Sequence, residues 1–581
     1  MLSSVIFLLL VTIFCFFTLY FIDLNEITSI LNQSFKKNYN ENLIYYYETD
    51  FQFRCFVSGL FLLVLLSFLM VYRKKILLVV PELSESFKIL IRSSKEAFKR
   101  QFSIHKRIYT FYFFWILLFS IAIRLYFLDS PIRYDEGFTH YYFTKKPWFL
   151  VLSYYDYPNN HIFHTILVKL FISIFGDSVV SLRLTAFVFG IGLIPLSYIY
   201  VSKVFNKNAA ILAVTFISIS SILLSYSVNA RGYTIIFCAF IILLILIEML
   251  KKHNDKLIWV LFVTIQVIGI YTIPVMLYIS FILYIYFVLS NGIKKENEQI
   301  HIPLSRIFLS GLIVLYFSMM LYMPVYLLMG AKVIVANETV QSFSFSYILS
   351  NVSENLLHTF RFFVTDLPLI VRFLLVGGIV SSFIFVKQCR YLIISIICFF
   401  FFIHFIQRVI PPPRVLAILF PVFYIFSAVG IISLVNKFWK LKMYPFSLVL
   451  SFCVLIFASF LIIKSNSPTE KFDVTPIRNY NPVFSYLKTE IGLNDRVLCR
   501  FPIESSVNSY FYFYKIPHFI LQNNVLESKN VFIIKGNKYL QSTDFILRKN
   551  DVNIHDFNKL YTLISKKNFD SAISILKYRR K

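Results

Sequence analysis

Charged side chains are scarce in this chain of 581 residues: 15% are Asp, Glu, Lys or Arg, whereas 58% are hydrophobic and 19% are aromatic. A soluble domain carries about 25% charged residues, so the composition excludes a soluble enzyme, a disordered chain and a fibrous protein. Glycine and proline are also few, at 15 and 19 residues, which leaves no room for a low-complexity linker. The sequence therefore indicates an integral membrane protein.

Cysteine is rare too, with seven residues in the whole chain, and no two of them form a C-x-x-C pair. Most lie inside or beside apolar runs, so we interpret them as small hydrophobic residues rather than metal ligands or a disulfide framework. The sequence indicates no cofactor; a divalent metal is possible but no ligand set supports it. The seven residues are Cys15, Cys55, Cys238, Cys389, Cys398, Cys453 and Cys499.

Acidic residues are outnumbered by basic ones, which gives a formal net charge of +27. In a soluble protein such an excess would suggest nucleic acid, but beside membrane spans positive charge marks the cytoplasmic side. We therefore expect no nucleic-acid partner.

Apolar runs predict the spans, because a membrane helix needs about 20 mostly apolar residues and about 13 runs come near this length. The predicted spans are Ser3–Phe21, Phe53–Tyr72, Ile108–Leu128, Leu182–Val201, Ala209–Ser227, Tyr233–Leu250, Leu257–Tyr271, Pro274–Leu289, Ile307–Met329, Leu369–Val386, Tyr391–Ile406, Leu416–Val435 and Tyr444–Ile463.

A further apolar stretch, Ile162–Phe175, is shorter and contains Lys169. It could cross the membrane or lie on its surface. If it does not cross, the basic loop Arg73–Arg107 and the five later basic clusters all fall on the cytoplasmic side, as the positive-inside rule requires. We therefore predict a surface helix here, an inside N-terminus and an outside C-terminus. The five clusters are Lys203/Lys207, Lys251/Lys252/Lys256, Lys294/Lys295, Lys387/Arg390 and Lys437/Lys440/Lys442.

The chain beyond Lys464 changes composition, because long apolar runs stop and Asn, Asp and Lys increase. Its patterns predict strands at Val497–Phe501 and Val531–Lys535, and helices at Pro482–Glu490 and Ser571–Lys577. We expect a small α/β domain on the outer face. The predicted organisation is a two-span hairpin with a basic cytoplasmic loop (1–107), a transmembrane catalytic domain (108–463) and an extracytoplasmic soluble domain (464–581).

Polar residues gather at the predicted outer face. They are Asp135 and Glu136 in the first outer loop, His161 before the surface helix, Arg231 at the end of a span and Arg414 after three prolines. Each has a simpler explanation: a solvated acidic pair, a helix cap, a snorkelling arginine or a rigid turn. Their convergence favours function, because ionisable groups near the membrane are costly.

This set of side chains suits one kind of chemistry. A carboxylate can deprotonate a hydroxyl nucleophile, and guanidinium groups can bind a phosphate and stabilise the charge that grows on it. Embedding in the membrane gives access to a lipid-borne substrate. Together these features describe sugar transfer from a lipid-phosphate carrier to an acceptor at the outer surface.

Arg183 is expected to be structural or lipid-facing.

The order of short motifs from about residue 108 to 435 resembles the GT-C superfamily of integral-membrane glycosyltransferases. The closest branch is that of the protein mannosyltransferases and aminoarabinose transferases (glycosyltransferase family 39-like). The motifs are Tyr134-Asp135-Glu136-Gly137, Pro158-Asn159-Asn160-His161 before an amphipathic helix, Phe175-Gly176-Asp177-Ser178, Ser181-Leu182-Arg183-Leu184, Lys203-Val204-Phe205, Ser225-Tyr226-Ser227, Arg231-Gly232-Tyr233 and Pro413-Arg414.

The resemblance implies a GT-C fold, a polyprenyl-phosphate-linked sugar donor and an inverting single displacement. Carried over, Asp135 matches the acidic base position, with Glu136 beside it. His161, Arg231 and Arg414 match residues expected at the donor phosphate. The acceptor can be a lipid, a glycan or a protein, and the resemblance places the enzyme in a bacterial inner membrane with its active site facing the periplasm.

The chain departs from the family pattern at two points. Many relatives have an acidic residue where this chain has Asn229, which puts a second carboxylate and a metal bound through it in doubt. Ile162-Phe163 also replaces the common prolines after the histidine.

Three other functions stay open. A transporter or flippase for lipid-linked sugars would share the spans and the polar face, but it often shows repeated halves. An O-antigen ligase or polysaccharide polymerase lacks the early Asp-Glu loop. A non-catalytic sensor or scaffold is the remaining alternative.

Overall fold

The computed structural model describes most of the chain. The described residues are 2–21, 51–75, 77, 81–82, 85, 88, 107–155, 159–291, 301–335, 341–364, 367, 369–438, 443–464, 477, 480–522, 524–539, 541–569 and 573–581. Most of the predicted basic loop Arg73–Arg107 and the start of the Pro158 motif lie outside these residues.

The membrane part is a bundle of helices, and every apolar run predicted to span the membrane is helical over most of its length. Its elements are α1 (Leu2–Phe21), α4 (Phe51–Val71), α6 (Arg107–Leu128), α10 (Val179–Val204), α11 (Lys207–Ile219), α12 (Ser221–Ser227), α13 (Tyr233–His253), α14 (Lys256–Thr272), α15 (Met276–Asn291), α16 (Leu304–Leu321), α17 (Met323–Met329), α20 (Leu369–Phe385), α21 (Lys387–Phe401), the π-helical turn η4 (Phe402–Ile406), α22 (Pro413–Leu416), η5 (Ala417–Leu419), α23 (Phe420–Phe438) and α24 (Met443–Lys464).

Among the described residues, seven helices are long and apolar enough to span a membrane, or eight if one bent pair counts as a span. The other predicted spans form shorter apolar helices, so the total of about 13 stays a prediction. The bent pair is α11 and α12, which meet at an angle of 65° at Ser220. The predicted span Ala209–Ser227 is therefore broken at Ser220.

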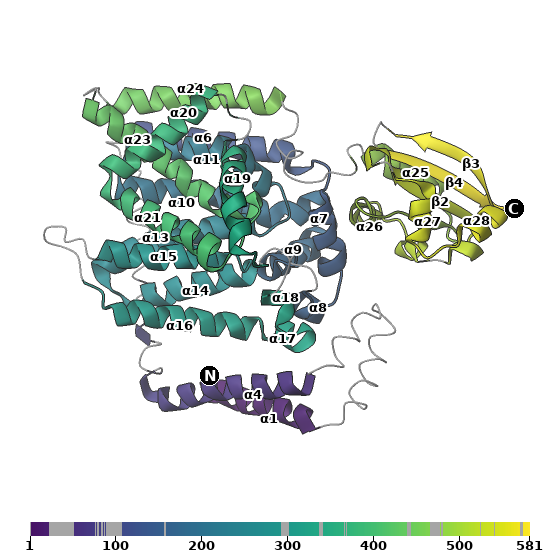
Figure 1. The fold of residues 1–581 in the computed structure, drawn as a ribbon, viewed down its shortest axis with the longest axis horizontal. Helices are drawn as coiled ribbons and strands as arrows, with labels where there is room; N and C mark the ends of the chain where they lie inside the picture. Colours follow the sequence, from purple (N-terminus) through teal and green to yellow (C-terminus); the bar gives the residue numbers. More distant parts are fainter. Residues whose placement is uncertain are drawn as a thin grey trace.

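Burial separates central helices from peripheral ones. In the stretch Pro413–Phe438, 89% of the most apolar segment is buried inside the protein. The buried share is 78% in α13 but only 22% in α16. Helices α20 and α23 pack closely because two glycines face each other: a Cβ on Gly430 would lie 1.8 Å from the Gly378 carbonyl oxygen. Helices α1 and α4 form a hairpin at one edge of the bundle (Figure 1).

Short helices cover one end of the bundle. The first loop contains α7 (Tyr134–Phe138), the π-helix η2 (Thr139–Thr144), α8 (Trp148–Ser153) and α9 (Ile162–Phe175). Helix α9 has the bounds predicted for the surface helix. It ends at Gly176, whose φ of +79° favours glycine. Two further helices follow α17: α18 (Lys332–Val335) and the amphipathic α19 (Phe345–Phe363).

The C-terminal part is a small α/β domain beside the α7 end of the bundle (Figure 1). Its four-stranded sheet has the order β1-β2-β4-β3, with β1 and β2 parallel and the other pairs antiparallel. Its elements are α25 (Tyr480–Glu490), β1 (Arg496–Leu498), α26 (Glu504–Phe513), η6 (His518–Leu521), η7 (Val525–Glu527), β2 (Asn530–Gly536), η8 (Asn537–Tyr539), α27 (Thr543–Arg548), α28 (Ile554–Leu560), β3 (Tyr561–Asn568) and β4 (Ile573–Arg580).

The expected architecture, a helical polytopic protein with a small C-terminal α/β domain, is confirmed. One element was predicted wrongly, since the helix expected at Ser571–Lys577 falls on strand β4. This strand lies inside the sheet, where Ile573 pairs with Gly536 and Ser574 pairs with Asn568. Over so short a stretch its apolar residues fit the helical period of about 3.6 as well as the strand period of about 2. Pairing with a strand on both sides favours the strand.

The domain and the bundle share one hydrophobic cluster. Ile132, Val168 and Leu182 from the membrane part pack with Phe484 and Tyr510 of the C-terminal domain. The backbones also meet closely, because a Cβ on Gly137 would lie 2.7 Å from the Ser505 carbonyl oxygen. The domain is therefore packed firmly against helix α7.

The contact between α20 and α23 gives a stability test. A Cβ on Gly378 would lie 2.4 Å from the Ser427 carbonyl oxygen, whereas a Cβ on the neighbouring Gly377 meets nothing within 4 Å. We expect Gly378→Ala to lower the free energy of unfolding by about 1–3 kcal/mol through overpacking, and Gly377→Ala to leave it nearly unchanged. Thermal unfolding in detergent measures both; equal unfolding temperatures would contradict the packing.

Candidate active site

Three consecutive residues of the first loop point to three different partners. Tyr134, Asp135 and Glu136 form the first turn of α7, where successive side chains are about 100° apart. Tyr134 contacts the C-terminal domain, Asp135 meets Arg231 and Glu136 meets Arg183. Helix α7 therefore lies where the C-terminal domain, the bundle core and the α12–α13 turn come together.

Glu136 and Arg183 form a buried two-pronged ion pair. Arg183 Nε donates to Glu136 Oε1 and Arg183 Nη2 donates to Oε2, both at 2.7 Å, and both side chains are buried. Arg183 also donates to the carbonyl oxygens of Leu128, Ser130 and Pro131 at 2.6–3.1 Å. The geometry is that of a strong bidentate guanidinium–carboxylate contact.

Backbone amides complete the surroundings of Glu136. The Arg133 amide donates to Oε2 at 2.9 Å and the Ala230 amide donates to Oε1 at 2.8 Å. Burial raises the pKa of Glu136, but Arg183 and these hydrogen bonds outweigh burial, so the pKa lies below its ordinary value. We interpret Glu136, which the sequence placed with the catalytic residues, as the group that joins α7, α10 and the turn before α13.

Asp135 forms an ion pair with Arg231. Arg231 Nη1 lies 3.1 Å from Asp135 Oδ2, and the side chains are 9% and 25% exposed, respectively. The backbone of Asp135 is fixed as well, because its carbonyl oxygen accepts from Thr139 Oγ1 at 3.0 Å and from Asn159 Nδ2 at 3.2 Å. Two residues predicted from separate motifs are thus in contact, and the carboxylate stays partly open to a substrate.

His161 lies beside the same turn. The Gly232 amide donates to His161 Nδ1 at 2.9 Å, so the ring proton is on Nε2, which is a donor. The approach needs glycine, because a Cβ on Gly232 would lie 2.5 Å from Thr272 Cγ2 and 3.3 Å from His161 Nδ1. Burial, and then Arg231, His164 and Arg414, lower the pKa of His161 well below its ordinary value. His161 is therefore neutral at pH 7.

Arg414 contributes to the electrostatics of this group. It lies in the exposed part of α22, and it is near enough to His161 to lower the pKa of that residue. Within the described part of the chain, no ion pair of Arg414 is found. The structure thus brings Asp135, His161 and Arg231 into contact or close approach, with Arg414 acting on the group through its field.

Of two buried residues that the sequence analysis did not select, His164 belongs to the same region and Arg124 lies at the break between α11 and α12. His164, one helical turn after His161, is fully buried, and neither ring nitrogen has a hydrogen-bond partner among the described residues. Arg124 of α6 is also buried and donates to the Ser120 and Ser218 carbonyl oxygens, next to the break at Ser220. The His-x-x-His spacing and an arginine inside an apolar run were the signals available in the sequence.

Asn229, the departure from the family pattern, is buried beside this turn. Across the described residues, no group of three or more His, Cys, Asp or Glu side chains is placed to bind a metal ion.

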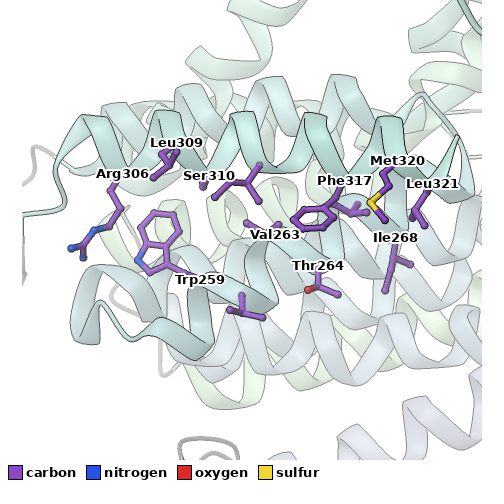
Figure 2. Close-up of a pocket in the computed structure, with 13 residues that line it drawn as sticks. Trp259, Val263, Thr264, Ile268, Arg306, Leu309, Ser310, Phe317, Met320 and Leu321 are labelled. Atoms are coloured by element: carbon purple, nitrogen blue, oxygen red, sulfur yellow. The ribbon is translucent and has the colours of Figure 1, made fainter. Parts of the chain in front are cut away.

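An apolar groove of about 590 Å³ lies between α14 and α16 (Figure 2). Trp259 and Arg306 line one end, and Ile268, Met320 and Leu321 line the other. The second end leads toward the site: the hydroxyl of the next residue, Tyr322, donates to the Ile270 carbonyl oxygen, and its ring packs edge-on against Tyr155 at 6.1 Å. Burial raises the pKa of Tyr155 while Arg231 opposes the rise, which places Tyr155 near Arg231.

A family model described as dolichyl-phosphate-mannose-protein mannosyltransferase matches residues 159–322. The match confirms the resemblance to GT-C glycosyltransferases of the protein-mannosyltransferase type and supports the transfer of lipid-linked sugars. It includes His161 and Arg231, whereas Asp135, Glu136 and Arg414 lie outside it. Among curated proteins, none matches this sequence.

The solved structures that are similar to the chain include the following three. ArnT from Cupriavidus metallidurans bound to undecaprenyl phosphate is 12% identical, with a TM-score of 0.49 over 80% of this chain and 98% of that one. The Archaeoglobus fulgidus oligosaccharyltransferase with zinc and sulfate is 14% identical, with a TM-score of 0.45 over 78% and 72%. AglB from the same organism, with an inhibitory peptide and dolichol phosphate, is 13% identical, with a TM-score of 0.44 over 82% and 75%.

The Glu136–Arg183 pair predicts a large stability effect. Glu136→Gln leaves the buried guanidinium without a countercharge, so we expect a loss of about 3–5 kcal/mol in the free energy of unfolding. The matched control is Glu354→Gln, which changes an exposed carboxylate of α19 that is 70% exposed. Thermal unfolding in detergent measures both, and similar unfolding temperatures would contradict the assigned role.

The same pair predicts a pH dependence. The pKa of Glu136 is lower in the folded state than its ordinary value. Its stabilising contribution is therefore complete above about pH 5, and it is lost as the pH falls through the folded pKa. We expect the acid loss of stability to be smaller in Glu136→Gln than in the unchanged protein.

Proposed function

We propose that this chain is a membrane glycosyltransferase similar to the protein mannosyltransferases, and that it transfers a sugar from a polyprenyl-phosphate donor to a hydroxyl acceptor with inversion at the anomeric carbon. The observation that carries the proposal is the ion pair between Asp135 and Arg231, with neutral His161 beside Arg231. A carboxylate next to a cationic phosphate site is the minimum that such a reaction needs.

The donor phosphate is proposed to lie near Arg231, Arg414 and His161. Both arginines act on His161 strongly enough to lower its pKa, so they create a positive potential at the same place. His161 adds a neutral Nε2–H donor without adding charge. A phosphate placed there would receive charge-assisted hydrogen bonds, which are stronger than neutral ones.

The reaction is proposed as a single displacement. The Asp135 carboxylate takes the proton of the acceptor hydroxyl while that oxygen forms a bond to the anomeric carbon. The bond from this carbon to the phosphate oxygen breaks, and polyprenyl phosphate leaves with the electron pair. Arg231 and Arg414 stabilise the negative charge that develops on the leaving group.

The site is proposed to face the outer side of the membrane. The support is the placement of the basic clusters: Lys251 is at the end of α13 that is remote from Arg231, and Lys203 is at the end of α10 that is remote from Arg183. The acceptor is then a lipid, a glycan or a protein outside the cytoplasm, and a bacterial inner membrane fits this arrangement.

The groove between α14 and α16 is proposed to bind part of the polyprenyl chain of the donor. Its lining is almost entirely apolar, and one end approaches the site through Tyr322 and Tyr155. A lipid whose phosphate lies near Arg231 could therefore extend along the groove within the membrane.

Asp135→Asn tests the base. We expect a fall in kcat of about 100-fold or more, since a general base contributes about 10²–10⁴ in rate and asparagine cannot accept the proton. The measurement is release of polyprenyl phosphate by purified enzyme supplied with cell-envelope extract as the source of acceptor hydroxyls and with polyprenyl-phosphate mannose or another polyprenyl-linked sugar as the donor. Asp544→Asn, an exposed carboxylate of α27, is the control and should keep full activity. Full transfer by Asp135→Asn would refute the assignment.

The groove predicts a dependence on donor chain length. Thr264→Trp fills part of the groove and should raise the KM for a long-chain donor about tenfold, because losing contact with two methylenes costs about 1.6 kcal/mol. A donor with a short chain should be unaffected. Leu118→Trp, on the exposed face of α6, is the matched control. Equal changes in KM for the long-chain and short-chain donors would show that the polyprenyl chain does not bind in this groove.

A further inference from the structure

We propose that the C-terminal domain carries an anion-binding acceptor subsite, formed by Arg496 and Arg500 next to Tyr134, and that its ligand is an acidic saccharide. The proposal rests on the proposed function, because it assigns the acceptor side of the same site. It goes further by naming the class of acceptor and the residues that recognise it.

The residues of the subsite come from two parts of the chain. Arg496 begins β1, Arg500 follows it closely, and Glu504 begins α26. Tyr134 and Tyr142 come from the first loop of the membrane part. The Tyr134 hydroxyl donates to Glu504 Oε1 at 3.4 Å, which joins the two groups.

Several polar atoms of this group are buried without a partner. Among the described residues, no hydrogen bond satisfies Arg496 Nε and Nη1, Arg500 Nε or Glu504 Oε2. A buried charged donor that lacks an acceptor costs about 1–3 kcal/mol or more. Three unsatisfied guanidinium atoms in one place therefore favour a bound group that supplies acceptor oxygens.

The charges in this group call for an anion. Arg496 and Arg500 are near enough for each to affect the other electrostatically, and burial and then Arg500 lower the pKa of Arg496. Glu504 is the nearby carboxyl, but burial raises its pKa, so it neutralises the two arginines less well than a solvated carboxylate would. A phosphate or carboxylate between the guanidinium groups would relieve the repulsion and accept their hydrogen bonds.

Aromatic rings beside the arginines indicate that the anion belongs to a saccharide. Phe501 is 61% exposed and lies edge-on to Tyr134 with ring centroids 5.1 Å apart. Tyr142 stacks on Phe138 at 4.3 Å. Apolar ring faces next to a few charged groups are typical of sites that bind a partly apolar, partly polar ligand such as a sugar.

The subsite lies beside the proposed base. Tyr134 and Asp135 are consecutive, and while Tyr134 reaches Glu504 of the C-terminal domain, Asp135 reaches Arg231. The donor phosphate is assigned to the Arg231 side, so an acceptor approaching Asp135 would extend toward the C-terminal domain. Its anionic group would then bind Arg496 and Arg500 while a separate hydroxyl is deprotonated.

Calorimetric titration of the full chain in detergent tests the subsite, with glucose 6-phosphate, glucuronate, inorganic phosphate and glucose as probes. We expect at least one of the two acidic sugars to bind at least tenfold more tightly than glucose and than inorganic phosphate. Arg496→Gln combined with Arg500→Gln should weaken that binding at least tenfold. Arg579→Gln, an exposed arginine at the end of β4 in the same domain, should leave it unchanged.

The outcomes separate this inference from the proposed function. Binding of inorganic phosphate as tight as that of both acidic sugars, or equal binding by the double variant, would overturn the acidic-saccharide subsite. Either result would leave the proposed transferase function open, because that function is tested separately by the release of polyprenyl phosphate. Replacing both arginines by lysine keeps the charge and controls for misfolding: it should restore part of the binding at an unchanged unfolding temperature.

Discussion

The buried ion pair between Glu136 and Arg183 is the contact on which the arrangement of the site depends. An unneutralised charge inside the protein costs several kcal/mol, so Glu136 requires the guanidinium and both backbone amides that surround it. The guanidinium comes from α10, the Ala230 amide from the turn before α13 and the Arg133 amide from the start of α7. Because Asp135 adjoins Glu136 and Arg231 adjoins Ala230, the same pair brings the two side chains proposed for the reaction opposite each other.

One helical turn thus combines structural and chemical roles. The side chains of Tyr134, Asp135 and Glu136 diverge by their helical spacing, and each meets a different part of the molecule. Gly137 then lets α26 approach the backbone of α7, so the C-terminal domain packs closely against the helical turn that carries Asp135. Substrate groups on either side of Asp135 would therefore meet fixed surfaces.

The sequence predicted what depends on local composition. Apolar length located the membrane helices, and the stretch Ile162–Phe175 is helical with the predicted bounds, as α9. Features that depend on residues distant in the sequence could not be predicted. The partner of Glu136 lies 47 residues away, and β4 is a strand because β2 and β3 pair with it on both sides. The bend at Ser220 is likewise accompanied by a distant residue, Arg124, which donates to the Ser218 carbonyl oxygen. Contacts of this kind have no signal in a single sequence.

The ion pair between Asp135 and Arg231 also bears on how charge moves in the proposed reaction. Asp135 loses its negative charge when it takes the acceptor proton, and the leaving phosphate gains negative charge in the same step. Arg231 is near both positions, so its stabilising field passes from one anion to the other without any movement of the cation. Preorganised charge of this kind needs no rearrangement in the transition state. Neutral His161 adds an Nε2–H donor to this arrangement without changing its net charge.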